Sequence, residues 1–312
     1  MAVFFSVNLG SGFKKEDMEK ILIAGGSGFI GTGLAAHLRN EGHEVRILTR
    51  KASDPEHFFL NWDPLAKTID PDAVENTTIL INLCGAELAA KRWTGTRIKE
   101  LYDSRVETTH FLFEAFENSP VLKHYISASG AVAYGFEHPE KTYTEEDTFG
   151  NDIISDITRK WEQAADQFGK KCLVSKIRIS IVLSKNGGAL VKLADPVKKG
   201  FGAVLGSGEQ VIPWIEDRDL FRIFAFVISN KLEGAYLAAA GNTTNEELTK
   251  LIAKTLNKKL LPAVPGLVIR ILFGKMAMML LYGNRVSNTK ITSAGFSFEE
   301  GDLNSTIRRI FG

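Results

Sequence analysis

The sequence predicts a doubly wound α/β fold, in which helices cover both faces of a parallel sheet. Strand-length runs that are almost wholly apolar alternate with helical patterns through the first half of the chain, as expected for strands buried on both faces. The first run leads directly into a glycine-rich turn and then a helix. An apolar fraction of 44% with 24% charged residues excludes a wholly disordered chain.

The first strand covers residues 20–24, and a helix follows from about Phe29 to Asn40. The turn at residues 41–43 introduces a second strand at 44–49. The later elements of this half are strands near 78–84, 124–129 and 172–178, with long helical patterns at 94–117 and 153–168 between them. We therefore expect a nucleotide-binding domain over residues 18–186.

From Gly187 the pattern changes to glycine-rich connections, a helix after Asp219, a short apolar run near 234–240, a helix near 244–256 and several short helices. We expect residues 187–312 to form mainly a smaller, mixed substrate lobe with a helical C-terminal region. It would close the crevice over the carboxyl ends of the strands, where doubly wound folds bind ligands. Residues 1–17 precede Met18 as an extension without an obvious place in the fold, and we expect them to be dispensable.

Charge and cysteine usage exclude several classes of function. The chain has 38 basic and 37 acidic side chains, so a net charge of +1 offers no basic field for nucleic acid. Residues 264–282 are the most apolar C-terminal stretch, but Arg270, Gly274 and Lys275 interrupt them before the roughly 20 residues that a span needs. We therefore expect no membrane partner.

Cys84 and Cys172 lie far apart in apolar runs, which is typical of buried thiols in a reducing compartment. The N-terminus lacks the basic region of a signal peptide, so we expect a cytoplasmic protein. No His-x-x-x-His pair occurs, and we expect no metal site.

The glycine-rich turn is Gly25-Gly26-Ser27-Gly28-Phe29-Ile30-Gly31, placed between a strand and a helix in the first βα unit. That context favours a dinucleotide site over a bare glycine turn. Glycine lets the backbone N–H groups approach a pyrophosphate, and the helix N-terminus adds roughly half a positive charge.

The end of the second strand indicates which dinucleotide binds. An NAD site usually has an acid there for the ribose hydroxyls, whereas this strand ends in Thr49-Arg50-Lys51. Two cations suit a 2′-phosphate and favour NADP. The alternative is that both are solvated surface side chains.

A series of further motifs, in this order along the chain, resembles the extended short-chain dehydrogenase/reductase superfamily. The resemblance is to its sugar-nucleotide epimerase-like, cell-division-inhibitor-like branch, an atypical one with its own C-terminal domain. It covers about residues 20–310. Besides the glycine turn, the motifs are Asn82-Leu-Cys-Gly-Ala86, Lys91-Arg-Trp-Thr94, Ser104-Arg-Val106, Ser127-Ala-Ser129, Tyr134-Gly135, Trp161-Glu162, Gly187-Gly-Ala-Leu190, Gly206-Ser-Gly208, Trp214 to Leu220, and Leu261-Pro-x-x-Pro265 through Phe296.

This resemblance implies an NADP-binding Rossmann domain and assigns cofactor contacts to matching positions. The phosphates would meet Gly25, Gly28, Phe29, Ile30 and Gly31, the 2′-phosphate Arg50 and Lys51, and the adenosine side Leu83, Cys84 and Gly85. Glu100 and Arg105 match cofactor-contacting positions, although an exposed, salt-bridged helix face is an equal alternative. Ser180 is a weaker assignment near the nicotinamide.

The sequence departs from the superfamily at the catalytic Tyr-x-x-x-Lys pair, in which the lysine lowers the tyrosine pKa for proton exchange during hydride transfer. None of the six tyrosines has a lysine four residues later, and the matching positions are Ile154 and Thr158. Ser129 and Tyr134 remain as hydroxyls near the expected nicotinamide position, unless they serve local hydrogen bonding and packing. Glu216 stands where the branch has a histidine.

Two functions stay open at this point. The first is an NADP-dependent, epimerase/dehydratase-like oxidoreductase acting on a small polar substrate, with a sugar nucleotide as one option. The second is a regulator that senses NADPH without catalysis. A homodimer is also open.

Overall fold

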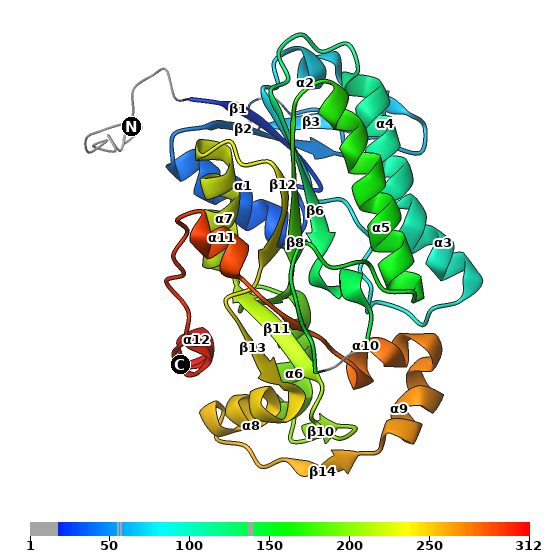
Figure 1. Cartoon of the computed structure of the whole chain (residues 1–312), viewed down its shortest axis with the longest axis vertical. Helices are drawn as coiled ribbons and strands as arrows, with labels where there is room; N and C mark the ends of the chain where they lie inside the picture. Colours follow the sequence, from blue (N-terminus) through cyan, green and yellow to red (C-terminus); the bar gives the residue numbers. More distant parts are fainter. Residues whose placement is uncertain (1–17, 55, 57, 137–139) are drawn as a thin grey trace, which may run out of the picture.

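A computed structural model of the chain describes residues 18–54, 56, 58–136 and 140–312. Its centre is an eight-stranded sheet in the order β12-β8-β6-β5-β1-β2-β3-β4, parallel except for the β3–β4 pair (Figure 1). The strands are β1 (Lys20–Ala24), β2 (Glu44–Thr49), β3 (Phe59–Asp63), β4 (Thr68–Ile69), β5 (Ile79–Asn82), β6 (His124–Gly130), β8 (Leu173–Ile179) and β12 (Gly234–Ala238). The predicted doubly wound fold is confirmed.

Helices cover both faces of this sheet, which explains why its strands are apolar at consecutive positions. In β1, Ile21 and Ile23 belong to the core formed with α1 (Phe29–Asn40) and α7 (Asp217–Ser229). Leu22 and Ala24 point to the opposite core, formed with α4 (Val106–Phe116). Because side chains alternate along a strand, one apolar run supplies both cores. The helices α2 (Pro71–Glu75), α3 (Gly95–Asp103) and α5 (Ile153–Asp166) accompany α4 (Figure 1).

The second lobe contains a three-stranded sheet, β13-β11-β9, and a two-stranded ribbon, β10-β14. Its elements are β9 (Ile181–Leu183), α6 (Gly188–Lys198), β10 (Ala203–Leu205), β11 (Val211–Glu216), β13 (Gly241–Thr244), α8 (Asn245–Thr255), β14 (Leu261–Val264), α9 (Gly266–Phe273), α10 (Met278–Leu281) and α12 (Leu303–Phe311). The short strand β15 (Arg285–Val286) pairs with β7 (Thr142–Tyr143), and α11 (Thr289–Ser293) lies against β12.

The boundary between the two lobes is less simple than a division at residue 186. Both α7 and β12 follow that residue, yet α7 packs on α1 and β12 forms the edge of the large sheet. The predicted helix 94–117 is also two helices, because the chain turns at Ser104 and Arg105 between α3 and α4.

The described part of the chain contains no helix with the length and apolarity needed to cross a bilayer. It also contains no group of three or more His, Cys, Asp or Glu residues placed to hold a metal ion. The predicted dispensable extension, residues 1–17, lies outside the described residues.

Candidate functional site

The glycine loop lies between the carboxyl end of β1 and the first turn of α1. Gly28 is the N-cap of α1; no side chain caps the helix and no acid stands in its first turn. The N–H groups of Phe29, Ile30 and Gly31, the first three residues of the helix, therefore have no side-chain partner. An anion at this position would accept hydrogen bonds from these N–H groups and be attracted by the positive end of the helix dipole.

The same loop contacts the end of β5. Gly25 has φ of +77°, and a Cβ there would lie 2.9 Å from the carbonyl carbon of Leu83 and 3.0 Å from the nitrogen of Cys84. The Phe29 ring lies against Gly187, where a Cβ would come within 3.0 Å of it. The backbone contacts and positive φ of Gly25 require glycine, whereas at Gly187 a Cβ would require the Phe29 ring to shift by a few tenths of an ångström. Through these two approaches the loop contacts both the segment after β5 and the start of α6.

Arg50 and Lys51 follow β2 and are both exposed. The backbone of this segment is fixed, because the Lys51 N–H donates to Thr49 Oγ1 over 3.2 Å and the Lys51 carbonyl accepts from Asn61 Nδ2 over 2.6 Å. Burial raises the pKa of the Cys84 thiol to about 12, and the charge of Arg50 opposes this shift. The charge of Arg50 therefore acts on the thiol of the segment that follows β5.

The segment Leu83, Cys84 and Gly85 takes its shape from Asn82, the last residue of β5. The Asn82 Oδ1 accepts the Cys84 N–H over 3.0 Å, while its Nδ2 donates to Thr109 and Tyr125 inside the protein. This buried amide directs the backbone after β5 toward the glycine loop.

Arg105 lies over this segment, whereas Glu100 does not contact it. A Cβ on Gly85 would come within 2.9 Å of the Arg105 guanidinium carbon, which also lies 5.4 Å from the centroid of the Trp161 ring. Burial lowers the pKa of Arg105 to about 10. Glu100 is instead exposed and paired with Arg97 over 2.6 Å, and this hydrogen bond lowers its pKa.

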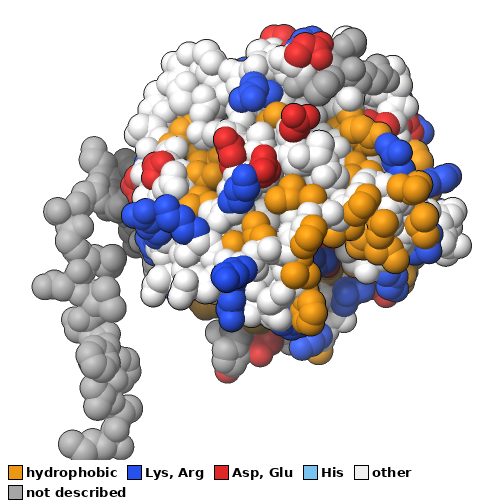
Figure 2. Space-filling model, turned by 90° about the horizontal axis from the view of Figure 1, so that it is seen from below, with side chains coloured by type: hydrophobic (Ala, Val, Ile, Leu, Met, Phe, Trp, Pro, Cys, Tyr) orange, Lys and Arg blue, Asp and Glu red, His pale blue; other side chains and the backbone are white. Residues whose placement is uncertain are grey.

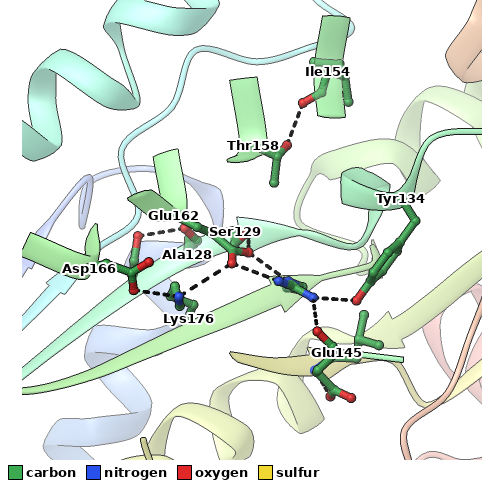
Figure 3. A network of polar contacts seen from close by, with 12 residues as sticks. Ala128, Ser129, Tyr134, Glu145, Ile154, Thr158, Glu162, Asp166 and Lys176 are labelled. Atoms are coloured by element: carbon green, nitrogen blue, oxygen red, sulfur yellow. Dashed lines mark hydrogen bonds and ion pairs between the residues drawn. The ribbon is translucent and has the colours of Figure 1, made fainter. Parts of the chain in front are cut away.

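Ser129 and Tyr134 belong to one buried polar network, drawn in Figure 3. The Ser129 hydroxyl, near the end of β6, donates to Glu162 Oε1 over 2.6 Å. Arg178 donates to both Glu162 oxygens, over 2.8 and 2.9 Å, and to the Tyr134 hydroxyl over 2.7 Å. Burial raises the pKa of Tyr134, and Arg178 only partly opposes that rise.

Ile154 and Thr158, the positions that the family resemblance aligns with the Tyr-x-x-x-Lys pair, lie on α5 and have structural contacts. Ile154 is buried in an apolar cluster with Trp93 and Met276, and the Thr158 hydroxyl donates to the Ile154 carbonyl over 2.8 Å. Lys160, one turn away, pairs with Asp156 on the outer face of α5.

The side chains of Ser180 and Glu216 both form hydrogen bonds or ion pairs within the protein. The Ser180 hydroxyl donates to the Ala238 carbonyl over 2.7 Å. Glu216 caps α7 by accepting the Arg218 N–H and pairs with Arg309 of α12 over 2.8 Å. Burial raises the pKa of Glu216 to about 7.

Sequence reasoning did not identify the loop between β5 and α3 as a connection to the second lobe. Lys192 of α6 pairs with Glu87 of this loop, and Arg92 donates to the Ile271 carbonyl of α9 over 3.4 Å. The ion pair between Glu162 and Arg178 was also missed. Its only sequence signal is Arg178 itself, which lies in a strand, Leu173–Ile179, that also contains Ser175 and Lys176.

The chain resembles known proteins along nearly its whole length. Residues 21–153 match the NAD dependent epimerase/dehydratase family, and residues 264–310 match DUF1731, a domain of unknown function. The mouse epimerase family protein SDR39U1 is 32% identical over 93% of this chain and 99% of its own length. An epimerase family protein of Mycobacterium tuberculosis is 33% identical over 92% of this chain and 96% of its own.

Solved structures agree with this assignment. The human epimerase family protein SDR39U1, crystallised with NADPH, has a TM-score of 0.85 and 30% identity over 93% of this chain and 98% of its own. A nucleoside-diphosphate sugar epimerase from Corynebacterium glutamicum has a TM-score of 0.77 and 26% identity over 95% of this chain and 58% of its own. The chain therefore belongs to the epimerase/dehydratase family of extended short-chain dehydrogenases/reductases, with a C-terminal DUF1731 domain.

Proposed function

We propose that this protein binds NADPH and acts as an epimerase/dehydratase-like oxidoreductase on a small polar substrate, with a sugar nucleotide as the leading class. One arrangement carries the proposal: Ala24 of β1 pairs with Leu48 of β2 and Asn82 of β5, so the glycine loop before the uncapped N-terminus of α1, the Arg50-Lys51 segment and the end of β5 all follow the same edge of the sheet. The NADPH in the human relative supports the same cofactor. NADPH supplies a hydride from C4 of its nicotinamide.

In this proposal the N–H groups of residues 29–31 bind the pyrophosphate. Arg50 and Lys51 bind the 2′-phosphate, residues 83–85 line the adenosine side, and Arg105 holds that segment in place. Glu100 and Ser180 are the weaker assignments, since both already have protein partners.

We assign the proton transfer that accompanies hydride transfer to the hydroxyls of Ser129 and Tyr134. Glu162 accepts the Ser129 hydrogen bond, so the serine hydroxyl can pass a proton between the crevice and a buried carboxylate. Arg178 orients the Tyr134 hydroxyl. General acid–base catalysis supplies a rate enhancement of about 10²–10⁴-fold. Because no lysine lowers the tyrosine pKa, we expect the turnover rate to lack part of this enhancement.

The second candidate is an NADPH sensor without catalysis. One observation favours it: both hydroxyls are buried and already hydrogen-bonded, and the matching catalytic positions hold Ile154 and Thr158.

Cofactor choice is tested by titrating NADPH and NADH into the protein and into Arg50→Ala. A charge-assisted bond to the 2′-phosphate contributes about 1.5–3 kcal/mol, which corresponds to roughly a 10- to 150-fold preference for NADPH. Arg50→Ala should lose that preference and keep its NADH affinity. Arg159→Ala, which also removes one positive charge but lies on α5 beside Asp156, is the control. Equal NADH and NADPH affinities in the unmodified protein would refute the assignment.

Catalysis is tested by following NADPH absorbance with carbonyl and sugar-nucleotide substrates, alongside Ser129→Ala and Tyr134→Phe. Turnover that survives both changes would reject these two residues and leave the enzyme in place. Tight NADPH binding without turnover on any substrate would favour the sensor.

A further inference from the structure

Helix α9 presents aliphatic side chains to solvent. Leu267 and Ile271 are each 67% exposed, and Val268 and Leu272 beside them are also exposed. Ile269 is the buried contact of this helix. A surface helix normally turns a polar face outward, so α9 has an apolar face for which the described protein supplies no cover.

Other exposed apolar side chains lie at the same end of the molecule. Phe201 is 72% exposed, and Leu261 is brought beside its segment by the hydrogen bond from the Leu261 N–H to the Gly202 carbonyl, 2.8 Å long. Tyr282 is tied to Arg270 of α9 over 2.8 Å. We call this surface the apolar end face; its residues are Phe201, Leu261, Leu267, Val268, Ile271, Leu272 and Tyr282. Figure 2 views this end of the molecule from below and shows hydrophobic side chains gathered on one side with Lys and Arg beside them.

The charge of the surrounding segment is strongly one-sided. Residues 248–298, which include α9, contain eight Lys or Arg and no Asp or Glu. The remainder of the chain has 30 basic and 37 acidic side chains, so the near-neutral total conceals a basic segment. Lys258, Lys259 and Lys275 are exposed, and within the described residues no acid forms an ion pair with them.

We propose that the apolar end face docks on an anionic phospholipid surface, with α9 lying in the plane of the interface. Exposed aliphatic residues next to lysines and arginines are the combination that interfacial helices use, because acyl chains take the former and head groups attract the latter. This proposal replaces the sequence-based expectation of no membrane partner, which rested on the lack of a spanning segment. It is independent of the cofactor and of catalysis.

The charge and the residue types of the apolar end face favour a lipid surface over a second copy of the chain or another protein. A second copy docked through the same face would bring its own lysines against these lysines, which costs free energy. A protein partner is usually held by Trp, Tyr and Arg anchors, whereas the most exposed side chains of this face are Phe201, Leu267 and Ile271.

The test is co-sedimentation of the full chain with vesicles of phosphatidylcholine alone or with phosphatidylglycerol added. We expect binding to the anionic vesicles, little binding to the neutral ones, and loss of binding as salt is raised. Leu267→Ser/Ile271→Ser should weaken the binding by about tenfold or more. Lys258→Gln/Lys259→Gln should weaken it by about fivefold per lysine at low salt.

Leu65→Ser is the matched control, because Leu65 is 92% exposed but lies in the turn between β3 and β4. Its binding should equal that of the unmodified protein. The proposal is overturned if anionic vesicles are not bound, or if both double variants bind like Leu65→Ser. It is also overturned if sedimentation velocity shows a dimer that Leu267→Ser/Ile271→Ser dissociates, since the face would then be a self-interface.

Discussion

Replacing Gly31 by alanine should separate α1 from the glycine loop. A Cβ at this position would lie 2.5 Å from the Gly26 Cα and 2.6 Å from the Gly25 carbonyl oxygen, whereas ordinary contacts begin at 3.4 Å. The helix or the loop must therefore move by about 0.9 Å, and both neighbours are backbone atoms that cannot rotate away.

Overpacking of this kind costs about 1–3 kcal/mol, and the better helix propensity of alanine returns about 0.5–1 kcal/mol. We expect a net loss of up to about 2.5 kcal/mol in the free energy of unfolding. The shift also moves the N–H groups of α1 away from the proposed phosphate position. Losing one charge-assisted hydrogen bond should weaken NADPH binding by about 10- to 150-fold.

Urea unfolding and NADPH fluorescence titration measure the two effects separately. Gly95→Ala is the control, because Gly95 begins α3 and a Cβ there would meet nothing within 4 Å. It should keep the NADPH affinity and gain a little stability. An NADPH affinity of Gly31→Ala equal to that of Gly95→Ala would refute the placement of the phosphate on this loop.

Three further predictions concern buried charges. Glu162→Gln leaves Arg178 without its buried carboxylate and should lower the free energy of unfolding by about 3–5 kcal/mol. The double variant Glu162→Gln/Arg178→Met should recover part of this loss. Urea unfolding that finds the single variant as stable as the unmodified protein would contradict the prediction. Burial raises the pKa of Glu216 to about 7, above that of an unfolded glutamate. Its contribution to the stability of the folded state is therefore present below about pH 4.5 and is lost as pH rises through 7. Glu216→Gln should reduce this loss in urea-unfolding midpoints measured across this pH range. Burial lowers the pKa of His124 to about 4, so its contribution to the stability of the folded state is present above about pH 6.5 and is lost as pH falls through 4. His124→Asn should remove this loss of stability at low pH. An unchanged dependence of the unfolding midpoint on pH would contradict the prediction.

The parts of the fold that the sequence predicted are those set by local chemistry. The β1 strand and α1 were predicted with their observed bounds, because an apolar run, a glycine turn and a helical period follow one another without interruption. The turn at Ser104 and Arg105 was missed, since both residues fit a continuous helix and their contacts with Gly85 and Ala86, distant in the sequence, cannot be read from the local pattern.

The candidate site divides in the same way. Glycines and cations that act near their own place in the chain could be assigned from motifs, although none of those assignments is yet tested. The Arg178–Glu162 pair could not be found, because the partners come from different elements and the pairing depends on how α5 packs across β8. Likewise, β12 looked like part of the second lobe, since only the completed sheet shows which edge it joins.

The chain passes repeatedly between the two lobes, at Ser180, at Glu216, at Ala239, near Gly283 and finally before α12. Neither lobe is therefore a contiguous piece of the gene. A protease that cuts one connection would leave the two halves linked by the others. Exchanging the second lobe with that of a relative would need five matched junctions instead of one. A change in ligand preference would thus be reached more readily by point substitutions than by recombination of whole domains.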